Sequence, residues 1–250
     1  MSRCPLGVCD GSGWIEDVET RSVSACACRP QLVAGRRARA LSAVIPRRYR
    51  GVSFDRPPVS DMPAPQVDVV RRYVRKLNER LDAGRGLWLF GGVGTGKTTL
   101  AMLVSQTALE QGRTVAIYSL PRLLARIRET FDDAEPGSYS TMLEQLGDVD
   151  LLHLDDVGAE KTSPWVLEQL YAIVNARYES ERAVMLTTNL SRDDLAEQIG
   201  ERTVSRLEEM CDVIPVMGRD RRRFEAVDRR ANPSAAQDPP PDDAPGLRLA

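Results

Sequence analysis

The sequence contains no apolar run that approaches about 18 residues, so no segment is expected to cross a bilayer as a helix. The first residues, Met1–Pro5, also lack the apolar stretch of a signal peptide. Without export, we expect a cytoplasmic location with no membrane partner, where the five cysteines stay reduced. Paired thiols are then interpreted as metal ligands before disulfides.

The sequence also has little net charge. Its 34 basic and 36 acidic residues leave a formal charge of −2, so the molecule as a whole does not indicate nucleic-acid binding. The charge is uneven, because residues 1–50 carry nine arginines against four acids and Arg219–Arg223 form a second basic cluster. Such patches can bind phosphate backbones, but solvated surface or contacts with a nucleotide explain them equally well.

Composition divides the 250 residues into four expected regions. Residues 1–30 contain four cysteines and form a small module without a periodic apolar face. Residues 31–65 are rich in arginine and then proline, which is typical of a linker. Residues 66–228 hold the main folded domain. Residues 229–250 contain five prolines and little to bury, so we expect a disordered tail.

Within the main domain, segments with helical and strand periodicity alternate. The expected helices are Val67–Leu81, Lys97–Gln111, Leu120–Thr130, a helix ending near Leu146, Pro164–Ser180, Arg192–Gln198 and Glu201–Met210. The expected strands are Leu87–Phe90, Val115–Tyr118, Asp150–Leu154, Ala183–Thr187 and Val213–Val216. This alternation predicts an α/β fold in which helices cover both faces of a parallel sheet.

The strongest motif follows the first expected strand and opens a helix. It matches G-x-x-x-x-G-K-[ST] in full and comprises Gly91, Gly92, Val93, Gly94, Thr95, Gly96, Lys97 and Thr98, followed by Thr99. Glycines let successive amides face inward, and the helix N-terminus adds positive potential for the phosphates of ATP. Lys97 supplies a mobile charge, and the Thr98 hydroxyl is expected to bind Mg²⁺. The sequence therefore predicts an ATPase.

Two acidic residues follow directly after the expected strand Asp150–Leu154. Asp155 fits the Walker B role of holding Mg²⁺, and Asp156 stands where a base would polarise the attacking water. The sole histidine, His153, lies within the same strand and is expected to pack in the core rather than bind metal. The next strand ends in Thr187-Thr188-Asn189. Asn189 is interpreted as a polar sensor that positions water, although a helix cap or turn residue remains an alternative.

The sequence leaves the roles of two further groups of residues undecided. Arg206 lies on an expected helix, where it is suited either to the γ-phosphate of a neighbouring subunit's ATP or to salt bridges with Glu208 or Glu209, and chemistry alone favours the salt bridges. Four thiols, Cys4, Cys9, Cys26 and Cys28, are enough for a tetrahedral Zn²⁺ site in a module too small to fold by its core alone. Cys211 lies in apolar surroundings and is expected to be a core residue.

Taken in order, these motifs resemble the DnaC/DnaI-type bacterial and phage helicase loaders, which are related to the IstB transposition helpers. The resemblance covers roughly residues 1–228. It rests on Cys9–Trp14, Cys26–Arg29, Ile45–Arg50, the P-loop, Leu154–Lys161, Asn175–Tyr178, Thr187–Ser191, Glu201–Leu207 and Gly218–Arg222.

The resemblance implies an AAA+ ATPase that binds single-stranded DNA, associates into a ring or spiral, and delivers a hexameric replicative helicase. It also implies that Arg206 is the arginine finger, that Arg221 or Arg222 is a second sensor touching ATP, and that the cysteine module contacts the helicase. Asp156 replaces the Glu usual in AAA+ proteins, which predicts slow or partner-dependent hydrolysis. A transposition helper binding duplex DNA is the alternative; a metabolic kinase is disfavoured because sensor and finger arginines suit subunit interfaces.

Overall fold

The computed structural model describes most of the chain between Cys4 and Asp220. The described residues are Cys4, 6–17, 21–30, 32–33, 45–132, 137–159 and 163–220. The expected second-sensor residues Arg221 and Arg222 and the expected tail 229–250 lie outside this set.

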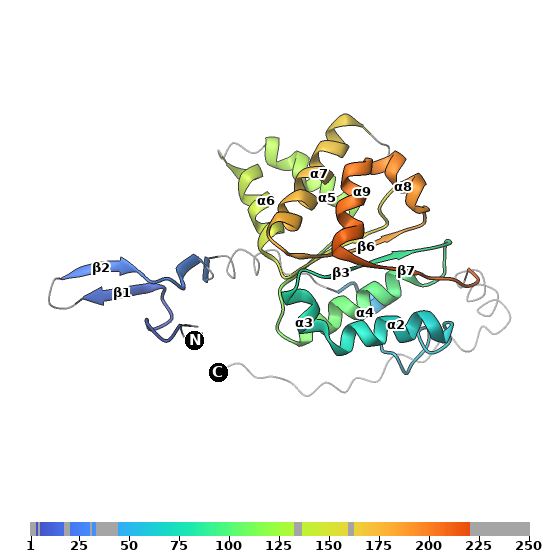
Figure 1. Cartoon of the computed structure of the whole chain (residues 1–250), viewed down its shortest axis with the longest axis horizontal. Helices are drawn as coiled ribbons and strands as arrows, with labels where there is room; N and C mark the ends of the chain where they lie inside the picture. Colours follow the sequence, from blue (N-terminus) through green and yellow to red (C-terminus); the bar gives the residue numbers. More distant parts are fainter. Residues whose placement is uncertain are drawn as a thin grey trace.

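The main body is built on a sheet of five parallel strands (Figure 1). The strands are β3 (Gly86–Phe90), β4 (Val115–Ser119), β5 (Leu151–Asp155), β6 (Ala183–Thr188) and β7 (Cys211–Pro215). Their order across the sheet is β4-β5-β6-β3-β7, so β5 and β3 flank β6. Every strand of the sheet was expected from the sequence, and the parallel arrangement confirms the predicted fold class.

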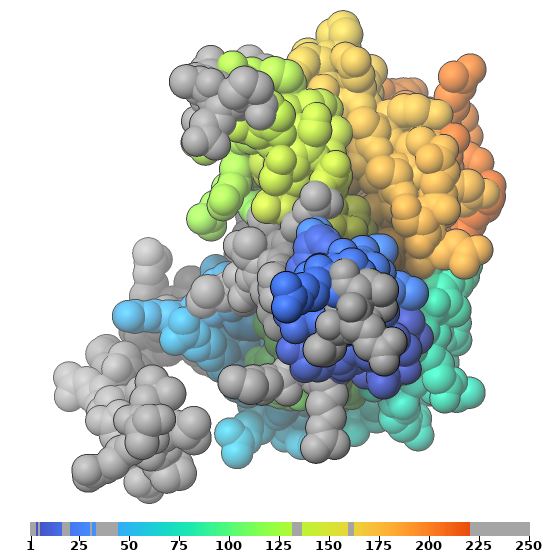
Figure 2. All heavy atoms as spheres, turned by 90° about the vertical axis from the view of Figure 1, so that its left-hand side faces the viewer, coloured from blue at the N-terminus to red at the C-terminus, as the bar shows by residue number. Residues whose placement is uncertain are grey.

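Helices cover both faces of this sheet (Figure 1). One layer contains α2 (Ala64–Arg75), α3 (Leu77–Asp82) and α4 (Lys97–Glu110). The other contains α5 (Leu120–Asp132), α6 (Ser138–Asp148), α7 (Pro164–Glu179), α8 (Arg192–Ile199) and α9 (Glu201–Met210). Alternate strand residues enter opposite layers: Leu87 and Leu89 pack on the first, and Trp88 on the second. Figure 2 shows α6 and α7 side by side in the second layer.

The helix expected over Val67–Leu81 is two helices, which corrects that prediction. Lys76 separates α2 from α3 with φ −114° and ψ 26°, outside the helical region. Val70, Leu77 and Leu81 are all buried in the same cluster. The break therefore redirects the chain while keeping both apolar faces on the sheet, a result of packing that periodicity alone does not reveal.

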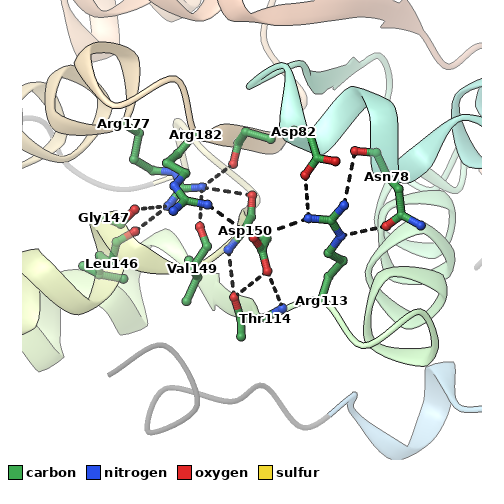
Figure 3. A network of polar contacts seen from close by, with 11 residues as sticks. Asn78, Asp82, Arg113, Thr114, Leu146, Gly147, Val149, Asp150, Arg177 and Arg182 are labelled. Carbon is green, nitrogen blue, oxygen red and sulfur yellow. Dashed lines mark hydrogen bonds and ion pairs between the residues drawn. The ribbon is translucent and has the colours of Figure 1, made fainter. Parts of the chain in front are cut away.

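The amino-terminal ends of the strands are tied together by a buried arginine (Figure 3). Arg177, on α7, donates to the carbonyls of Leu146 at 2.5 Å, Val149 at 3.0 Å and Ala183 at 2.6 Å. It thus joins the end of α6 to the start of β6. Burial, assisted by the charge of nearby Arg182, lowers the pKa of Arg177 to about 9, so the guanidinium stays charged at neutral pH.

A second set of charges completes this edge (Figure 3). Asp150 accepts from the backbone N–H and the hydroxyl of Thr114, at 2.9 and 2.8 Å, and pairs with Arg182 at 3.3 Å. Arg113 lies 3.7 Å from Asp150 and donates to Asp82 on α3. Both helical layers and the sheet are therefore connected at the edge where the strands begin.

Residues preceding α2 also contact the main body. The 3₁₀ helix η1 (Arg47–Tyr49) lies beside α4, and Val59 and Met62 are buried in the core cluster that includes α2 and α4. The region from 31 to 65, expected to be a linker, thus packs on the body in part. The domain boundaries themselves remain predictions. None of the described helices is long and apolar enough to cross a membrane.

The cysteine-containing segment forms a short antiparallel hairpin of β1 (Trp14–Asp17) and β2 (Ser22–Ala25). Trp14 pairs with Ala25 in the register, and the guanidinium of Arg29 lies 3.4 Å from the centre of the Trp14 ring. With so few apolar residues, the hairpin depends on other contacts for stability.

Candidate functional site

The P-loop connects β3 to α4, as the sequence predicts. Gly96 has φ +103°, a conformation that glycine adopts without strain, and Lys97 begins the helix. A Cβ atom at Gly96 would also collide with the side chain of Met62. The motif therefore needs glycine here for its backbone shape, and the resulting turn directs the N-terminus of α4 at the site.

Lys97 lies curled over the loop. Its Nζ donates to the carbonyl oxygens of Gly91 at 2.9 Å and Gly92 at 2.7 Å, and to Oδ1 of Asn189 at 2.7 Å. The residue is only 7% exposed. The ammonium group thus donates at the centre of the loop to carbonyl and amide oxygens, which are acceptors that phosphate oxygens can replace.

Two hydroxyl groups converge on the carboxylate of Asp155. Oδ1 accepts from Thr98 Oγ1 at 2.9 Å and from Thr187 Oγ1 at 2.7 Å. These three residues come from α4, β5 and β6, which meet at the carboxyl edge of the sheet. Carboxylate and hydroxyl oxygens are the hard ligands that Mg²⁺ prefers, so the chemistry of this donor set fits the expected ion.

Asp156 and Asn189 form the next part of the site. Asp156 has φ +59°, unusual for a residue other than glycine, and its backbone N–H donates to Thr187 Oγ1 at 2.9 Å. Asn189 Nδ2 donates to Asp156 Oδ1 at 3.1 Å while its carbonyl oxygen accepts from Lys97. The cap of α8 is Ser191, which accepts from the backbone N–H of Asp194. The alternative in which Asn189 is a helix cap is therefore wrong.

These groups line one cavity of about 350 Å³, within the range of small-ligand sites. The predicted residues in its lining are Val93, Gly94, Gly96, Lys97, Thr98, Thr99, Asp155, Asp156 and Asn189. Gly91, Gly92 and Thr95 are absent from that lining and instead shape the loop; Thr95 Oγ1 donates to the Gly92 carbonyl at 3.0 Å.

Sequence reasoning missed the other wall of the cavity, formed by Arg48, Tyr49, Pro58 and Met62. They come from η1 and the segment before α2, which composition had suggested was a linker. The only signal was the Ile45–Arg50 segment, which contributed to the family resemblance without a role. Local sequence gave no means of placing these residues beside a loop some forty positions later.

Arg206 lies on α9, and it is absent from the lining of the nucleotide cavity. Its guanidinium lies 4.7 Å from the centre of the Tyr171 ring and 5.5 Å from that of Tyr178. Glu208 instead pairs with Arg192, and Glu209 accepts from the Tyr178 hydroxyl. Among the described residues, no ion pair joins Arg206 to either acid, so the salt-bridge alternative is wrong.

His153 is fully buried in β5, as expected. Its Nδ1 lies 3.0 Å from Ser105 Oγ on α4, and its Nε2 lies 3.9 Å from Asp155 Oδ1. Burial lowers the pKa of His153 to about 4, against the opposing effect of the Asp155 charge, so the ring is neutral near pH 7. The sequence predicted its burial but not its neighbours.

The four N-terminal cysteines converge as predicted. Their sulfur atoms all lie within 4.8 Å of one another, with Cys4 to Cys26 at 4.0 Å and Cys9 to Cys28 at 3.6 Å. A zinc–sulfur tetrahedron with bonds of about 2.3 Å has edges of about 3.8 Å, so the spacing fits Zn²⁺. The backbone N–H of Cys9 makes the main contribution to lowering the pKa of Cys4 to about 6. Cys211 lies in the core instead, with its Sγ 3.2 Å from the Val184 carbonyl.

The parallel sheet, the P-loop and the acids at the end of β5 define the chain as an ATPase of the AAA+ class. The model of the IstB-like ATP binding protein family matches residues 66–227, and the chain belongs to this family. That match spans the P-loop, both acids, Asn189 and Arg206.

Two relatives in Escherichia coli K12 are similar over about half of their length. The replicative helicase loader DnaC is 29% identical over 138 residues, which cover 55% of this chain and 54% of DnaC. The uncharacterised protein YdaV is 32% identical over 117 residues, 47% of this chain and 46% of YdaV.

Solved structures show the same fold. The crystallised DnaC helicase loader is 26% identical with a TM-score of 0.60, covering 69% of this chain and all of that chain. The crystal structure of DnaI has a TM-score of 0.57 at 22% identity, over 70% of this chain and 96% of that one. DnaA bound to AMPPCP and single-stranded DNA has a TM-score of 0.59 at 21% identity, over 76% and 56%. The last two show the fold alone.

Proposed function

We propose that this protein is a cytoplasmic, ATP-dependent helicase loader that binds single-stranded DNA and delivers a hexameric replicative helicase during DNA replication. The observation that carries this proposal is the similarity to the DnaC helicase loader, at 26% identity over the whole of that crystallised chain. A DNA-replication ATPase is the coarser conclusion that the family and relatives already support.

In this proposal the P-loop amides of Gly91–Thr98 bind the phosphates of ATP. Lys97 gives up its hydrogen bonds to the Gly91 and Gly92 carbonyls and donates to the terminal phosphate oxygens instead. Thr98 and Asp155 would hold Mg²⁺, which when bound would supply charge stabilisation to the transferring phosphoryl group. The hydroxyl of Thr187 fixes the Asp155 carboxylate from the side of β6. Arg48 and Tyr49 face the remainder of the nucleotide.

Asp156 serves as the base that polarises the attacking water, and Asn189 orients it. The hydrogen bond from Asn189 Nδ2 to Asp156 Oδ1 supports this assignment, because it links the base to the amide that also holds Lys97. The shorter Asp side chain makes hydrolysis slow or dependent on a partner, as suits a switch that must persist until loading is complete.

Arg206 acts on the ATP of a neighbouring subunit in a ring or spiral. Its absence from its own chain's cavity, and its stacking on Tyr171 and Tyr178 rather than on an acid, support that role. Arg221 or Arg222 would contact the nucleotide in the same chain as the second sensor. ATP then closes the interface by bringing Lys97 and Asp155 of one subunit to Arg206 of the next.

The cysteine module binds Zn²⁺ through Cys4, Cys9, Cys26 and Cys28 and contacts the helicase. Three of the four thiols are buried. Among the described residues, Ile15 and Leu32 are the aliphatic side chains packed beside them, so a metal would supply much of the module's folding energy.

A transposition helper that binds duplex DNA as a filament is the second candidate, because the matching family model is described as IstB-like. The two functions differ in DNA substrate and protein partner, which makes them separable in one purified system.

The test uses the full chain with the replicative helicase of the same cell and with matched single-stranded and duplex DNA, with and without ATP. We expect an ATP-dependent complex with the hexamer and tighter binding to the single strand. Cys28→Ser should abolish helicase binding, whereas Ser24→Ala, on the exposed face of β2, should not. Co-purification with a transposase and preference for duplex DNA would sink the loader proposal in favour of the second candidate.

A further inference from the structure

A buried polar chain runs beneath the nucleotide site from α4 to the end of β5. Ser105 and His153 are both fully buried, and their Oγ and Nδ1 atoms lie 3.0 Å apart. His153 Nε2 has no hydrogen-bond partner among the described residues, yet it faces Asp155 Oδ1 at 3.9 Å. A buried nitrogen aimed at a site carboxylate calls for an explanation, because burial of an unpaired polar atom is costly.

Two periodicities bring these side chains together. Thr98 and Ser105 lie two turns apart on α4 and therefore share one face of that helix. His153 and Asp155 alternate with Leu154 along β5 and share one face of the strand. That helix face packs on that strand face, so Thr98 meets Asp155 and Ser105 meets His153. The polar chain is thus a continuation of the site into the core.

Electrostatics selects one tautomer of the ring. If Nδ1 carried the proton and donated to Ser105, the lone pair of Nε2 would face the Asp155 carboxylate in a water-free region. If Ser105 donates to Nδ1, Nε2 carries the proton and its N–H dipole points toward the carboxylate. Both hydrogen-bonding groups of the chain then have favourable neighbours, so the second arrangement is the stable one.

We propose that His153 is a positioning residue for Asp155: its neutral ring, held by Ser105, directs an N–H at the carboxylate that binds magnesium. This inference rests on the proposed role of Asp155. The hydroxyls of Thr98 and Thr187 approach Oδ1 from α4 and β6, and the imidazole adds a third positive dipole from the core side. At 3.9 Å this is an oriented dipole rather than a hydrogen bond.

A hydrolytic use of the same three residue types is inconsistent with the structure. Ser105 is fully buried and does not line the nucleotide cavity, so no substrate bond reaches its hydroxyl. In addition, the Asp155 carboxylate, which faces His153 Nε2, already accepts hydrogen bonds from the hydroxyls of Thr98 and Thr187 in the nucleotide site. The chain of contacts therefore serves Asp155, not Ser105.

The experiment measures the Mg²⁺ concentration that gives half-maximal binding of a fluorescent, non-hydrolysable ATP analogue to the full chain. Groups that orient a metal ligand typically change metal affinity by about 10-fold or more. We expect His153→Leu and His153→Asn to raise the half-maximal concentration about 10-fold. Asparagine retains a group near Nδ1 for Ser105 but cannot reach Asp155. Glutamine places an amide N–H near Nε2, so His153→Gln should recover most of the loss.

Ser105→Ala provides a second test that removes one hydroxyl and leaves the ring in place. It should raise the half-maximal Mg²⁺ concentration by a smaller factor in the same direction, because the tautomer is no longer fixed. Circular dichroism and nucleotide binding in the presence of EDTA check that each variant is folded. If His153 had a purely structural role, every variant would have a changed melting temperature, and His153→Gln and His153→Asn would have the same half-maximal Mg²⁺ concentration.

Three results overturn the inference in different ways. If the Gln, Asn and Leu variants all retain the wild-type Mg²⁺ dependence, or if Gln is as impaired as Asn, His153 does not position Asp155. If Asp155→Ala also leaves the dependence unchanged, the proposed role of Asp155 fails with it. If the wild-type protein shows no Mg²⁺-dependent nucleotide binding, the proposed ATPase site itself fails.

Discussion

The two edges of the central sheet use polar groups in opposite ways. At the edge where the strands begin, Arg177 and Asp150 are enclosed by backbone and side-chain partners that nothing else can replace (Figure 3). At the edge where the strands end, Lys97 donates to carbonyl and amide oxygens and Asp155 accepts from hydroxyl groups, beside an open cavity. The first arrangement stabilises the fold, and the second can be rearranged by a ligand.

The largest expected effect comes from breaking the closed edge. Arg177→Leu leaves several buried carbonyls without a donor, so it should lower the free energy of unfolding by about 4 kcal/mol. Chemical denaturation measures this change. Arg182→Leu is the matched control, since its pairing with Asp150 is partly exposed and should contribute less than about 1 kcal/mol. Equal losses in the two variants would contradict the comparison.

At the open edge, Lys97→Ala should leave stability nearly unchanged and lower ATP turnover by at least about 100-fold, since it removes the charge that stabilises the transferring phosphates. Steady-state hydrolysis in the assembled state gives the rate, and thermal melting gives the stability. Lys76→Ala, an exposed lysine between α2 and α3, is the control. A variant that hydrolysed ATP normally would refute the proposed role of Lys97.

Asp156→Asn should lower the rate of hydrolysis by at least about 10-fold while leaving nucleotide affinity within a factor of about two, because a base acts on the reaction rather than on binding. Single-turnover hydrolysis and equilibrium binding separate the two effects. A loss of affinity as large as the loss of rate would show that Asp156 holds the nucleotide instead.

The smallest effect is expected at the edge of the closed network. Thr114→Val removes the hydroxyl that donates to Asp150 and accepts from its backbone N–H, so it should cost about 1 kcal/mol of stability. Thr141→Val, at an exposed position of α6, is the control for the same change of side chain. A cost above that of Arg177→Leu would reverse the order of importance inferred for this edge.

Sequence was sufficient for those parts of the molecule in which the chemistry lies in consecutive residues. The P-loop, the acids at the end of β5 and the parallel sheet all follow local rules of spacing and periodicity. The convergence of the four thiols was likewise predicted from residue type alone. In each case the residue types and their spacing in the sequence were enough for the prediction, and the structure supplied the distances between the side chains.

Other parts depend on contacts between distant segments, which no local rule specifies. Arginine is rarely buried, so sequence gave no reason to place Arg177 in the core. Arg48 and Met62 reach the nucleotide cavity only because the chain before α2 folds back on α4. The stacking of Arg206 on Tyr171 and Tyr178 depends on how α7 and α9 pack.

The side-chain amide of Asn189 touches the ammonium of Lys97 with its oxygen and the carboxylate of Asp156 with its nitrogen. In the proposed function, one planar group thus couples the lysine that binds the phosphates to the carboxylate that polarises the attacking water. If Lys97 turns to a phosphate, as that function requires, the Asn189 amide loses its hydrogen bond on that side. The proposed function would thereby link nucleotide binding to the positioning of water through the side-chain torsions of Asn189.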